Sequence, residues 1–512
     1  MSDFPWLTTL IAVPLVGALV TAAFPRTPGA RLPKQVAFGF SLLTVAVVLG
    51  TLTQYYTGPE MQLTETHDWI AAFGAHYALG MDGLSLVLVG LTAVLVPIVI
   101  LASWDDADER NTNVFFALML ALEGLALGVF VATDVLLFYV LFEGTLIPAY
   151  FLIGAFGRDD RAKAAVKFLL YMLAGGLIML ASVIGLYAVS ADNGAPTYLI
   201  SDLAALDLGG ETGRWLFVGF FIAFAIKCPL FPVHTWLADT TAAATPGTSV
   251  LLVCVLDKIG TYGMIRFCLG LFPEASDWAT PLVITMALIS IIYGALVAVG
   301  QDDMLRLIGL TSLSHFGFIV LGIFVMNSQG LSGSTLFMLN HGIATAALFL
   351  VAGYLIRRRG GSALISEQGG LEKVAPVLAG LFLLGGLATL GLPGLSPFVS
   401  EFLVILAAFS HTWWIGSIAV FGIVLAAVYV LVMYARTFTG PIVAGAEKMT
   451  DLGVREVVAV APLMLALVFF GFYPKPVLDV INPLTDSVMT QIGHTDKPAV
   501  VPAEPLAEEA HP

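Results

Sequence analysis

The sequence is poor in charge, since only 11% of its 512 residues are Asp, Glu, Lys or Arg. Soluble globular domains usually contain about 25% charged residues. Hydrophobic residues make up 58% of the chain, and they lie in long runs without the alternation typical of membrane β-barrels. These features exclude a soluble fold and a barrel, and they predict an all-α polytopic membrane protein.

Cysteines and basic patches are also scarce. The three cysteines, Cys228, Cys254 and Cys268, fall in apolar stretches and form no CxxC pair. This pattern indicates small core residues, and it predicts neither a disulfide framework nor an iron–sulfur cluster. The formal net charge is −14, and no basic patch suits a nucleic acid. We therefore expect no nucleic-acid partner.

The sequence lacks the short motifs that mark many enzyme active sites. It contains no HExxH or similar metal-ligand spacing, no Walker loop and no GxGxxG that follows a strand. Motifs for haem or flavin are also absent. We therefore expect no cofactor, no metal and no redox centre in this chain.

The apolar runs divide into about fourteen segments, each near the length that a bilayer requires. Basic residues follow the first run rather than precede it, which favours an uncleaved helix with its N-terminus outside over a signal peptide. An even number of spans would place both termini on the outer face. The predicted spans are roughly residues 5–24, 35–55, 78–103, 112–131, 133–156, 165–190, 214–233, 247–271, 280–300, 305–326, 333–356, 375–408, 413–437 and 454–473.

This topology predicts how the basic residues should be distributed. Of the 22 Lys and Arg residues, sixteen fall in inner connections and three in outer segments. The other three, Lys227, Lys258 and Arg266, lie within spans. The asymmetry supports the topology through the positive-inside rule. The loop DDADER after the third span is net acidic, but acidic residues contribute little to that rule.

Two of the predicted spans contain Pro/Gly breaks, AIKCPLFPVH in the seventh and LGLPGLSPFVSEF in the twelfth. They are five spans apart, so a five-helix repeat copied once would place them in opposite orientations. Paired broken helices indicate inverted-repeat transporters, although Pro and Gly are common in membrane helices. The predicted parts are three N-terminal spans (1–110), a first repeat that takes protons up (111–271), a second repeat that releases them (272–437), a last span (438–475) and a polar, acidic tail (476–512).

Residues 219–267 are apolar enough to lie in a bilayer, yet they contain Lys227, His234, Lys258 and three prolines. A charged side chain at mid-bilayer costs about 2.5–3.5 kcal/mol, although a single lysine near a helix end can reach water. The five mid-span acids and lysines would together cost on the order of 15 kcal/mol if unpaired, so they must pair, lose their charge or contact water. Further candidate ionisable residues within spans are Glu123, Glu143, His315, His341 and Glu401.

Each of these residues also has a plainer interpretation. A lone histidine in a membrane helix is often a hydrogen-bonded helix contact, and Glu123 could be a protonated packing residue. Asp257 could simply pair with the adjacent lysine, and His234 could cap a broken helix. Glu143 is the hardest to explain in this way, because a short side chain at mid-span cannot reach water. The imidazoles at mid-span suit intermediate relays, since their charge changes near pH 6–7.

Six stretches between roughly residues 75 and 475 resemble the antiporter-like proton-pumping subunits of respiratory complex I. In having glutamate at position 401, the sequence resembles the M-type branch of this family. The L- and N-type subunits, and the D-type subunits of multisubunit Na⁺/H⁺ antiporters, have lysine at the corresponding position. The long lateral helix of the L-type branch is not present after the last span. The stretches are FYVLFEGTLIPAYFLIGAFG, KFLLYMLAGG, FAIKCPLFPVHTWLADTTAAATPGTSVLL, LTSLSHFGFIVLG, LNHGIATAALFLVAGYLIRR and LATLGLPGLSPFVSEFLVI.

The resemblance implies a proton-translocating membrane-arm subunit of a bacterial NADH-quinone oxidoreductase, driven by quinone reduction elsewhere in the complex. Its neighbours would be L- and N-type subunits in the bacterial plasma membrane. Two alternatives are a subunit of a multisubunit Na⁺/H⁺ antiporter and a non-pumping structural spacer of the membrane arm. The resemblance implies that Glu143 and Lys227 form a charge pair that responds to the neighbouring subunit. It implies that Lys258 is the central proton carrier, that His315 and His341 lie on the hydrated axis, and that Glu401 is the exit group. Glu123 would belong to the pathway without a specific role.

Overall fold

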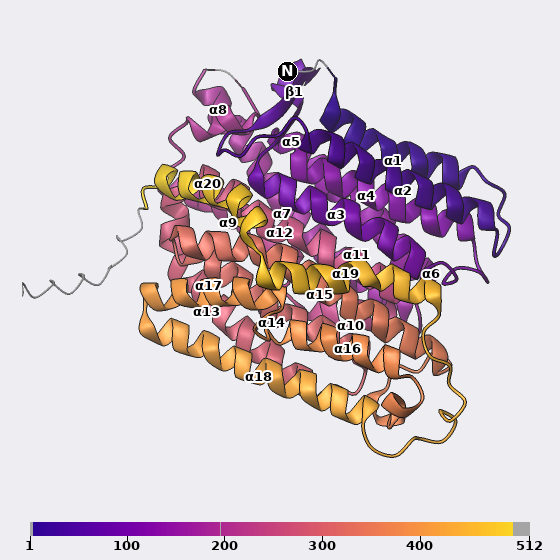
Figure 1. Cartoon of the computed structure of the whole chain (residues 1–512). Helices are drawn as coiled ribbons and strands as arrows, with labels where there is room; N and C mark the ends of the chain where they lie inside the picture. The colour runs from indigo at the N-terminus through magenta and orange to yellow at the C-terminus, as the bar shows by residue number, and fades with distance from the viewer. Residues whose placement is uncertain (1–3, 195, 495–512) are drawn as a thin grey trace, which may run out of the picture.

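The computed structural model describes residues 4–194 and 196–494, and it consists almost entirely of long helices packed side by side (Figure 1). Among these residues, eleven helices are long and apolar enough to cross a membrane. Three shorter apolar helices accompany them, namely Trp6–Ala22, Pro376–Thr389 and Ser396–His411. The prediction of a polytopic helical membrane protein is confirmed.

The N-terminal half (indigo to magenta) packs against the C-terminal half (orange to yellow), and α19 runs along the junction between them (Figure 1). The first elements are α1 (Trp6–Ala22), α2 (Arg31–Leu52), β1 (Gln62–Ile70), the 3₁₀ turn η1 (Ala71–Phe73), β2 (Ala75–Met81) and α3 (Gly83–Ala102). They are followed by α4 (Thr112–Val131), α5 (Val135–Gly144), α6 (Leu146–Phe156), α7 (Arg161–Asp192), α8 (Ile200–Ala204), α9 (Gly210–Lys227) and α10 (Thr235–Ala243).

One continuous helix then combines α-helical and π-helical turns. It comprises α11 (Pro246–Leu251), η2 (Leu252–Leu256), α12 (Asp257–Gly263) and η3 (Met264–Leu269), of which η2 and η3 are π-helical. The remaining elements are α13 (Pro273–Val299), α14 (Met304–Phe324), α15 (Ser328–Arg358), the 3₁₀ turns η4 (Ile365–Glu367) and η5 (Leu371–Lys373), α16 (Pro376–Thr389), α17 (Ser396–His411), α18 (Trp413–Phe438), α19 (Val454–Phe472) and α20 (Lys475–Gln491).

Both predicted helix breaks are present. The helix α9 ends at Lys227 and the next helix begins at Thr235, while α16 ends at Thr389 and α17 begins at Ser396. Proline inside a helix removes a backbone donor and clashes with the preceding turn, so it kinks or breaks the helix, and two prolines, Pro229 and Pro232, follow Lys227 within five residues. Pro397 instead occupies the first turn of α17, where a missing N–H is tolerated.

All fourteen predicted spans coincide with helices, but three of them are not single long apolar helices. The first helix is short, and the seventh and twelfth segments are broken. The count of fourteen spans and the inverted relation between the two repeats therefore remain predictions.

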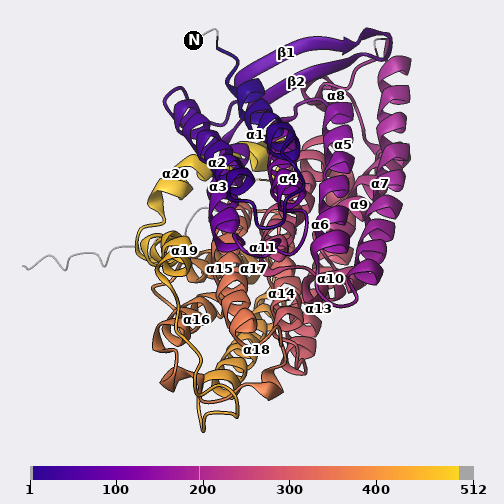
Figure 2. The ribbon, with the colours of Figure 1, turned by 90° about the vertical axis from the view of Figure 1, so that its right-hand side faces the viewer.

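The structure contains elements that the sequence pattern does not predict, among them the short helices α8 and α10, a β-hairpin and α20. The strands β1 and β2 form an antiparallel hairpin at one end of the helices (Figure 2), and α20 lies within the predicted acidic tail. Neither segment is apolar enough to resemble a span. The alternation of polar and apolar residues in the two strands is too short to be distinguished from a loop. The part of the predicted tail beyond residue 494 lies outside the described residues.

The two ends of the helices differ in charge. We call one end the arginine face, because the predicted inner connections meet there through ion pairs. The other end, the hairpin face, holds β1, β2, α8 and α20 (Figure 2). The ion pairs of the arginine face are Lys34–Asp108, Arg357–Asp105, Arg357–Asp106, Arg455–Asp105 and Arg358–Glu456.

Asp134 joins the hairpin to α5. Its carboxylate accepts hydrogen bonds from the backbone N–H of His76 at 2.8 Å and from that of Leu137 at 3.0 Å. The first bond holds β2, and the second caps the N-terminus of α5. The side chain is completely buried, so neither donor can find water if the carboxylate is removed.

Asp134→Ala is therefore expected to lower the free energy of unfolding by about 1–3 kcal/mol, through loss of a cap and of a buried charge-assisted bond. The midpoint of thermal unfolding in detergent, followed by circular dichroism, measures this effect. Asp202→Ala is the matched control, because Asp202 is exposed in α8 on the same face. Equal midpoints for the two variants would contradict the prediction.

Candidate functional site

Lys258 lies at the centre of the molecule, in α12. Its side chain is 0% exposed. The Nζ atom donates to the carbonyl oxygen of Val253 at 3.2 Å and lies 2.6 Å from Nδ1 of His341. The ring centroid of Phe316 is 4.5 Å from Nζ. A lysine enclosed in this way does not extend to the membrane surface, which removes the snorkelling interpretation for Lys258.

The backbone around Lys258 is unusual. Val253, whose carbonyl oxygen accepts from the ammonium, lies in the π-helical segment η2. A second π-helical segment, η3, follows α12 directly. Such segments are rare and occur frequently at functional sites.

The predicted histidines extend the arrangement away from Lys258. The rings of His341 in α15 and His315 in α14 pack edge to face, with their centroids 5.2 Å apart. His315 Nε2 lies 3.1 Å from the carbonyl oxygen of Thr389, the last residue of α16. Both rings are buried, and Nε2 of His341 and Nδ1 of His315 have no partner among the described residues.

Glu401 lies beyond the second helix break. Gly391 follows Thr389 closely and has a φ of +74°, and a Cβ at this glycine would lie 2.0 Å from Oε2 of Glu401. The glycine is thus required both by the turn and by the approach of the carboxylate. Asn340 in α15 donates to the carbonyl oxygen of Ser396 at 2.7 Å and so fixes the start of α17.

We call Lys258, His341, His315 and Glu401 the central row. The structure brings these four predicted residues together from α12, α15, α14 and α17. Contacts link the first three directly, and the break between α16 and α17 connects His315 to Glu401 through Thr389 and Gly391.

Lys227 and Glu143 form a second group. Lys227 ends α9 and is buried, and its Nζ donates to Oγ1 of Thr145 at 3.3 Å. The ring centroid of Phe142 is 4.6 Å from the same atom. Lys227 interacts electrostatically with Glu143 and Asp257, although no ion pair within 4.0 Å joins it to either carboxylate.

Glu143 differs from the other predicted carboxylates because it lies at the side of the molecule. It is only partly buried, and Oε1 has no partner among the described residues. A Cβ at Gly176 in α7 would lie 1.8 Å from Oε1, so this glycine makes room for the carboxylate. The helices α5, α6 and α7 that hold Glu143 and Gly176 also carry exposed apolar side chains, namely Val140, Ile147, Phe151, Leu170 and Leu177.

Three residues considered from the sequence stay apart from the central row. Glu123 in α4 is buried, and no hydrogen bond or ion pair among the described residues joins it to the row. His234 precedes α10 but makes no side-chain capping bond, and its ring stacks on Phe231. Asp257 is buried beside Lys258 in the sequence, without an ion pair to it within 4.0 Å.

A buried ion pair joins Arg266 to Asp82, and neither residue is a predicted site residue. Nη2 of Arg266 donates to Oδ2 of Asp82 at 2.5 Å, and these residues are 184 positions apart. The spacing of eight residues between Lys258 and Arg266 could have indicated that both lie on one side of a helix. No sequence signal would have identified Asp82 as the partner.

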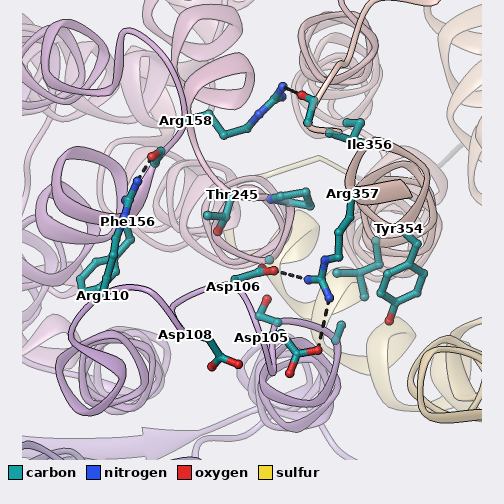
Figure 3. A pocket seen from close by; sticks show the side chains of 18 of the residues that line it. Asp105, Asp106, Asp108, Arg110, Phe156, Arg158, Thr245, Tyr354, Ile356 and Arg357 are labelled. Carbon is teal, nitrogen blue, oxygen red and sulfur yellow. Dashed lines mark hydrogen bonds and ion pairs between the residues drawn. The ribbon is translucent and has the colours of Figure 1, made fainter. Parts of the chain in front are cut away.

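A cavity of about 690 Å³ opens on the arginine face, between the α3–α4 connection, the start of α11 and the end of α15 (Figure 3). Arg357 reaches across it to Asp105 and Asp106, and Arg158 donates to the carbonyl oxygen of Gly361. Burial raises the pKa of the Asp106 carboxyl above its usual range, although the guanidinium of Arg357 acts in the opposite direction. We call this the arginine-face cavity.

The arrangement as a whole consists of groups that can accept and release protons. Among the described residues, no group of three or more His, Cys, Asp or Glu side chains could hold a metal ion. The central row instead provides an ammonium, two imidazoles and a carboxyl in sequence, which are suited to stepwise proton transfer.

Two family models match the sequence. The model described as "NADH:quinone oxidoreductase/Mrp antiporter, TM" matches residues 132–426. The model described as "NADH-ubiquinone oxidoreductase chain 4, amino terminus" matches residues 42–129. Together they cover most of the helices, including all residues of the central row.

Individual proteins give the same relationship. NADH-quinone oxidoreductase subunit M of Mycobacterium tuberculosis is 48% identical, with 100% of both chains covered. A chain of respiratory complex I from Thermus thermophilus with bound NADH has a TM-score of 0.86 at 32% identity, covering 95% of this chain and 100% of that one. A chain of the Mrp complex from Dietzia sp. DQ12-45-1b has a TM-score of 0.84 at 21% identity, covering 96% and 100%, and shares the fold.

Proposed function

Because this chain belongs to the family of the M-type, antiporter-like subunits of NADH-quinone oxidoreductase, we propose that it translocates protons in the membrane arm of that enzyme. Quinone reduction elsewhere in the complex supplies the driving force. The observation that carries this function is the central row, in which Lys258, His341 and His315 are in contact within the apolar interior. We further propose that NADH, quinone and the redox centres belong to other subunits.

We propose that the arginine face is cytoplasmic and that the hairpin face is the outer one. The arginines and lysines of the predicted inner connections gather on the former, as the positive-inside rule requires. The chain then lies in the bacterial plasma membrane with its N-terminus outside. The C-terminus is proposed on the same side, since α20 lies on the hairpin face.

The proposed path begins in the arginine-face cavity, which reaches the first turn of the helix that carries Lys258. Lys258 holds the proton and passes it through His341 and His315 to Glu401, from which it leaves on the outer side. Moving one charge against 100 mV requires about 2.3 kcal/mol. The polar atoms of the row that lack a protein partner are buried, and buried polar groups are normally satisfied, so we infer that water completes the path.

The second group provides the proposed coupling. Glu143 and Lys227 attract each other across the end of α5, and Lys227 in turn is electrostatically linked to Asp257, next to Lys258 in the chain. A charge movement in a neighbouring subunit would act first on Glu143, because this carboxylate lies at the side of the bundle. Displacement of the Glu143 carboxylate changes the electric field at Lys227 and then at Lys258. This change drives the proton along the central row. Glu123 is proposed as an additional proton-binding group.

The partly exposed carboxylate also supports a neighbouring subunit as partner. A carboxylate that faces lipid is costly, and the exposed apolar side chains of α5, α6 and α7 would be buried by a second protein. We propose L- and N-type subunits on the two sides of this chain.

The five predicted parts, with boundaries at residues 110, 271, 437 and 475, are retained as the proposed organisation, with uptake in the first repeat and release in the second.

The complex that contains this chain, reconstituted in proteoliposomes, tests the proposed function. NADH oxidation by quinone should generate an uncoupler-sensitive pH gradient that does not depend on Na⁺. A Na⁺ requirement would favour the alternative of an Na⁺/H⁺ antiporter subunit, and a chain that tolerates loss of the central row would be a structural spacer.

Asp106→Asn tests the uptake route. Burial raises the pKa of Asp106, which favours a proton on this side chain more than on an exposed aspartate, and asparagine cannot carry that proton. The pH at which NADH-driven pumping is half-maximal on the alkaline side should therefore fall. Pumping is followed with a pH-sensitive dye between pH 6 and 9. Glu109→Gln, on the exposed rim of the same cavity, should leave the profile unchanged, and an identical profile in Asp106→Asn would exclude this route.

A further inference from the structure

A second cavity, of about 370 Å³, opens on the hairpin face and reaches the helix that carries Lys258. Its walls come from β1, β2, the end of that helix and α20. Arg266 lines it, and lies eight residues after Lys258, which is about 12 Å along a helix. If Lys258 holds the proton, this cavity offers a way to the outer side that bypasses His341, His315 and Glu401.

Arg266 occupies the place where such a short path would run. Its Nη2 donates to Asp82 at 2.5 Å and its Nε donates to the hydroxyl of Tyr262 at 3.4 Å. The guanidinium also packs on the Tyr262 ring, 5.4 Å from the centroid. The side chain of Arg266 is 14% exposed and that of Asp82 is 1% exposed.

With Arg266 in place, neither Tyr262 nor Arg266 can pass a proton from Lys258 to the cavity. The hydroxyl of Tyr262 donates to the backbone carbonyl of Phe130 at 3.1 Å, and a carbonyl has no proton to release in turn. Arginine carries only donors and stays protonated in proteins, so it cannot accept a proton from Tyr262. The ammonium of Lys258 itself is directed to Val253 and His341, away from this end of the helix.

We propose that Arg266 is a seal, which prevents a proton on Lys258 from leaving directly through the hairpin-face cavity and so commits it to the path through Glu401. Asp82, the N-cap of α3, accepts a hydrogen bond from the guanidinium, and packing on Tyr262 also keeps the guanidinium in this position. The proposal rests on the proposed role of Lys258 as the proton carrier. The competing role for the same pair is a purely structural one, joining α3 to the Lys258 helix.

Passive proton flux distinguishes the two roles. The intact complex is reconstituted in proteoliposomes, a potassium diffusion potential is imposed with valinomycin without NADH, and a pH dye reports the flux. Arg266→Gln should raise this flux several-fold, lower the number of protons moved per NADH and remove the stimulation of NADH oxidation by uncoupler. Arg214→Gln is the matched control, because Arg214 forms an exposed ion pair with Glu274 on the same face. It should leave the flux at the level of the unmodified complex.

Asp82→Asn separates sealing from joining. This variant weakens the connection between α3 and the Lys258 helix but leaves the guanidinium in the path. A seal predicts a leak in Arg266→Gln and none in Asp82→Asn, whereas a structural pair predicts equal effects of the two changes. Equal leaks in both variants, or no leak in assembled Arg266→Gln, would overturn the proposal. If Arg266→Gln does not assemble, Arg266→Lys keeps the charge with a group that can release its proton, and it should leak.

Lys258→Met separates this proposal from the proposed function. Adding Lys258→Met to Arg266→Gln should return the passive flux to its original level, because the leak begins at Lys258. A double variant that still leaks as strongly as Arg266→Gln would overturn the seal and leave the pumping role of Lys258 intact. Full pumping in Lys258→Met alone would instead overturn the proposed function.

Discussion

Glu143→Gln in the assembled complex is expected to abolish NADH-driven proton pumping and to lower coupled NADH:quinone activity at least about tenfold, which corresponds to about 1.4 kcal/mol. Glutamine has nearly the same volume and fits against Gly176, so the change removes the charge and leaves the packing. Two unit charges 4 Å apart interact by about 4 kcal/mol at an effective dielectric constant of 20. Glu143 and Lys227 are farther apart than 4.0 Å, yet a fraction of that energy suffices for a tenfold effect.

Proton pumping and NADH oxidation are measured together in proteoliposomes, and native gels report the amount of assembled complex. Glu274→Gln provides the matched control, because Glu274 loses the same charge at an exposed position on the hairpin face. Its pumping should equal that of the unmodified complex. Normal pumping in assembled Glu143→Gln would show that the proposed coupling does not pass through this carboxylate.

The parts of the site that the sequence could predict are those where a residue is energetically unfavourable in its immediate sequence surroundings. A charge within a long apolar run is expensive wherever it occurs, so Lys258 and Glu401 stand out without any knowledge of their neighbours. The helix breaks are equally local, because prolines, which kink or break an α-helix, lie shortly after Lys227 and before Ser396. The predicted fold class and the positions of the breaks are confirmed for this reason.

The parts that the sequence could not predict depend on residues distant in the chain. Thr145 as the partner of Lys227, and the carbonyl of Thr389 as the partner of His315, follow only from the packing of helices. Gly176 is one of 51 glycines, and nothing in its surroundings indicates that it faces Glu143. The pattern of polar and apolar residues identifies which residues are buried. It does not identify which of them are in contact.

The hairpin and α20 escape prediction for a different reason. Both lie at the hairpin face, where the chain is neither apolar enough for a span nor regular over many residues. Their role becomes visible only with the cavity that they enclose, since α20 covers the side on which Arg266 is reached. Asp82 likewise resembles an ordinary N-cap in the sequence. Only the structure shows that its second carboxylate oxygen accepts a hydrogen bond from Arg266.

Lys258→Met is expected to abolish pumping altogether, whatever the driving force. Methionine fills much of the same space between His341 and Phe316 but cannot carry a proton, so the central row loses its first member. Pumping and NADH oxidation in proteoliposomes measure the effect. Lys373→Met is the control, because Lys373 is exposed and donates to a backbone carbonyl oxygen on the arginine face. A spacer without a pumping role would tolerate both changes equally.

Lys258→Arg decides whether Lys258 moves a proton or only supplies a fixed positive charge. Arginine keeps the charge near His341 but does not release its proton, whereas lysine can. If the lysine is the proton carrier, the arginine variant should fail to pump in the same way as Lys258→Met, although native gels show an assembled complex. If the row needs only a fixed charge at this point, Lys258→Arg should restore most of the pumping that Lys258→Met loses. The proposed path through His341, His315 and Glu401 requires the first outcome, because a proton that never leaves residue 258 cannot enter the row.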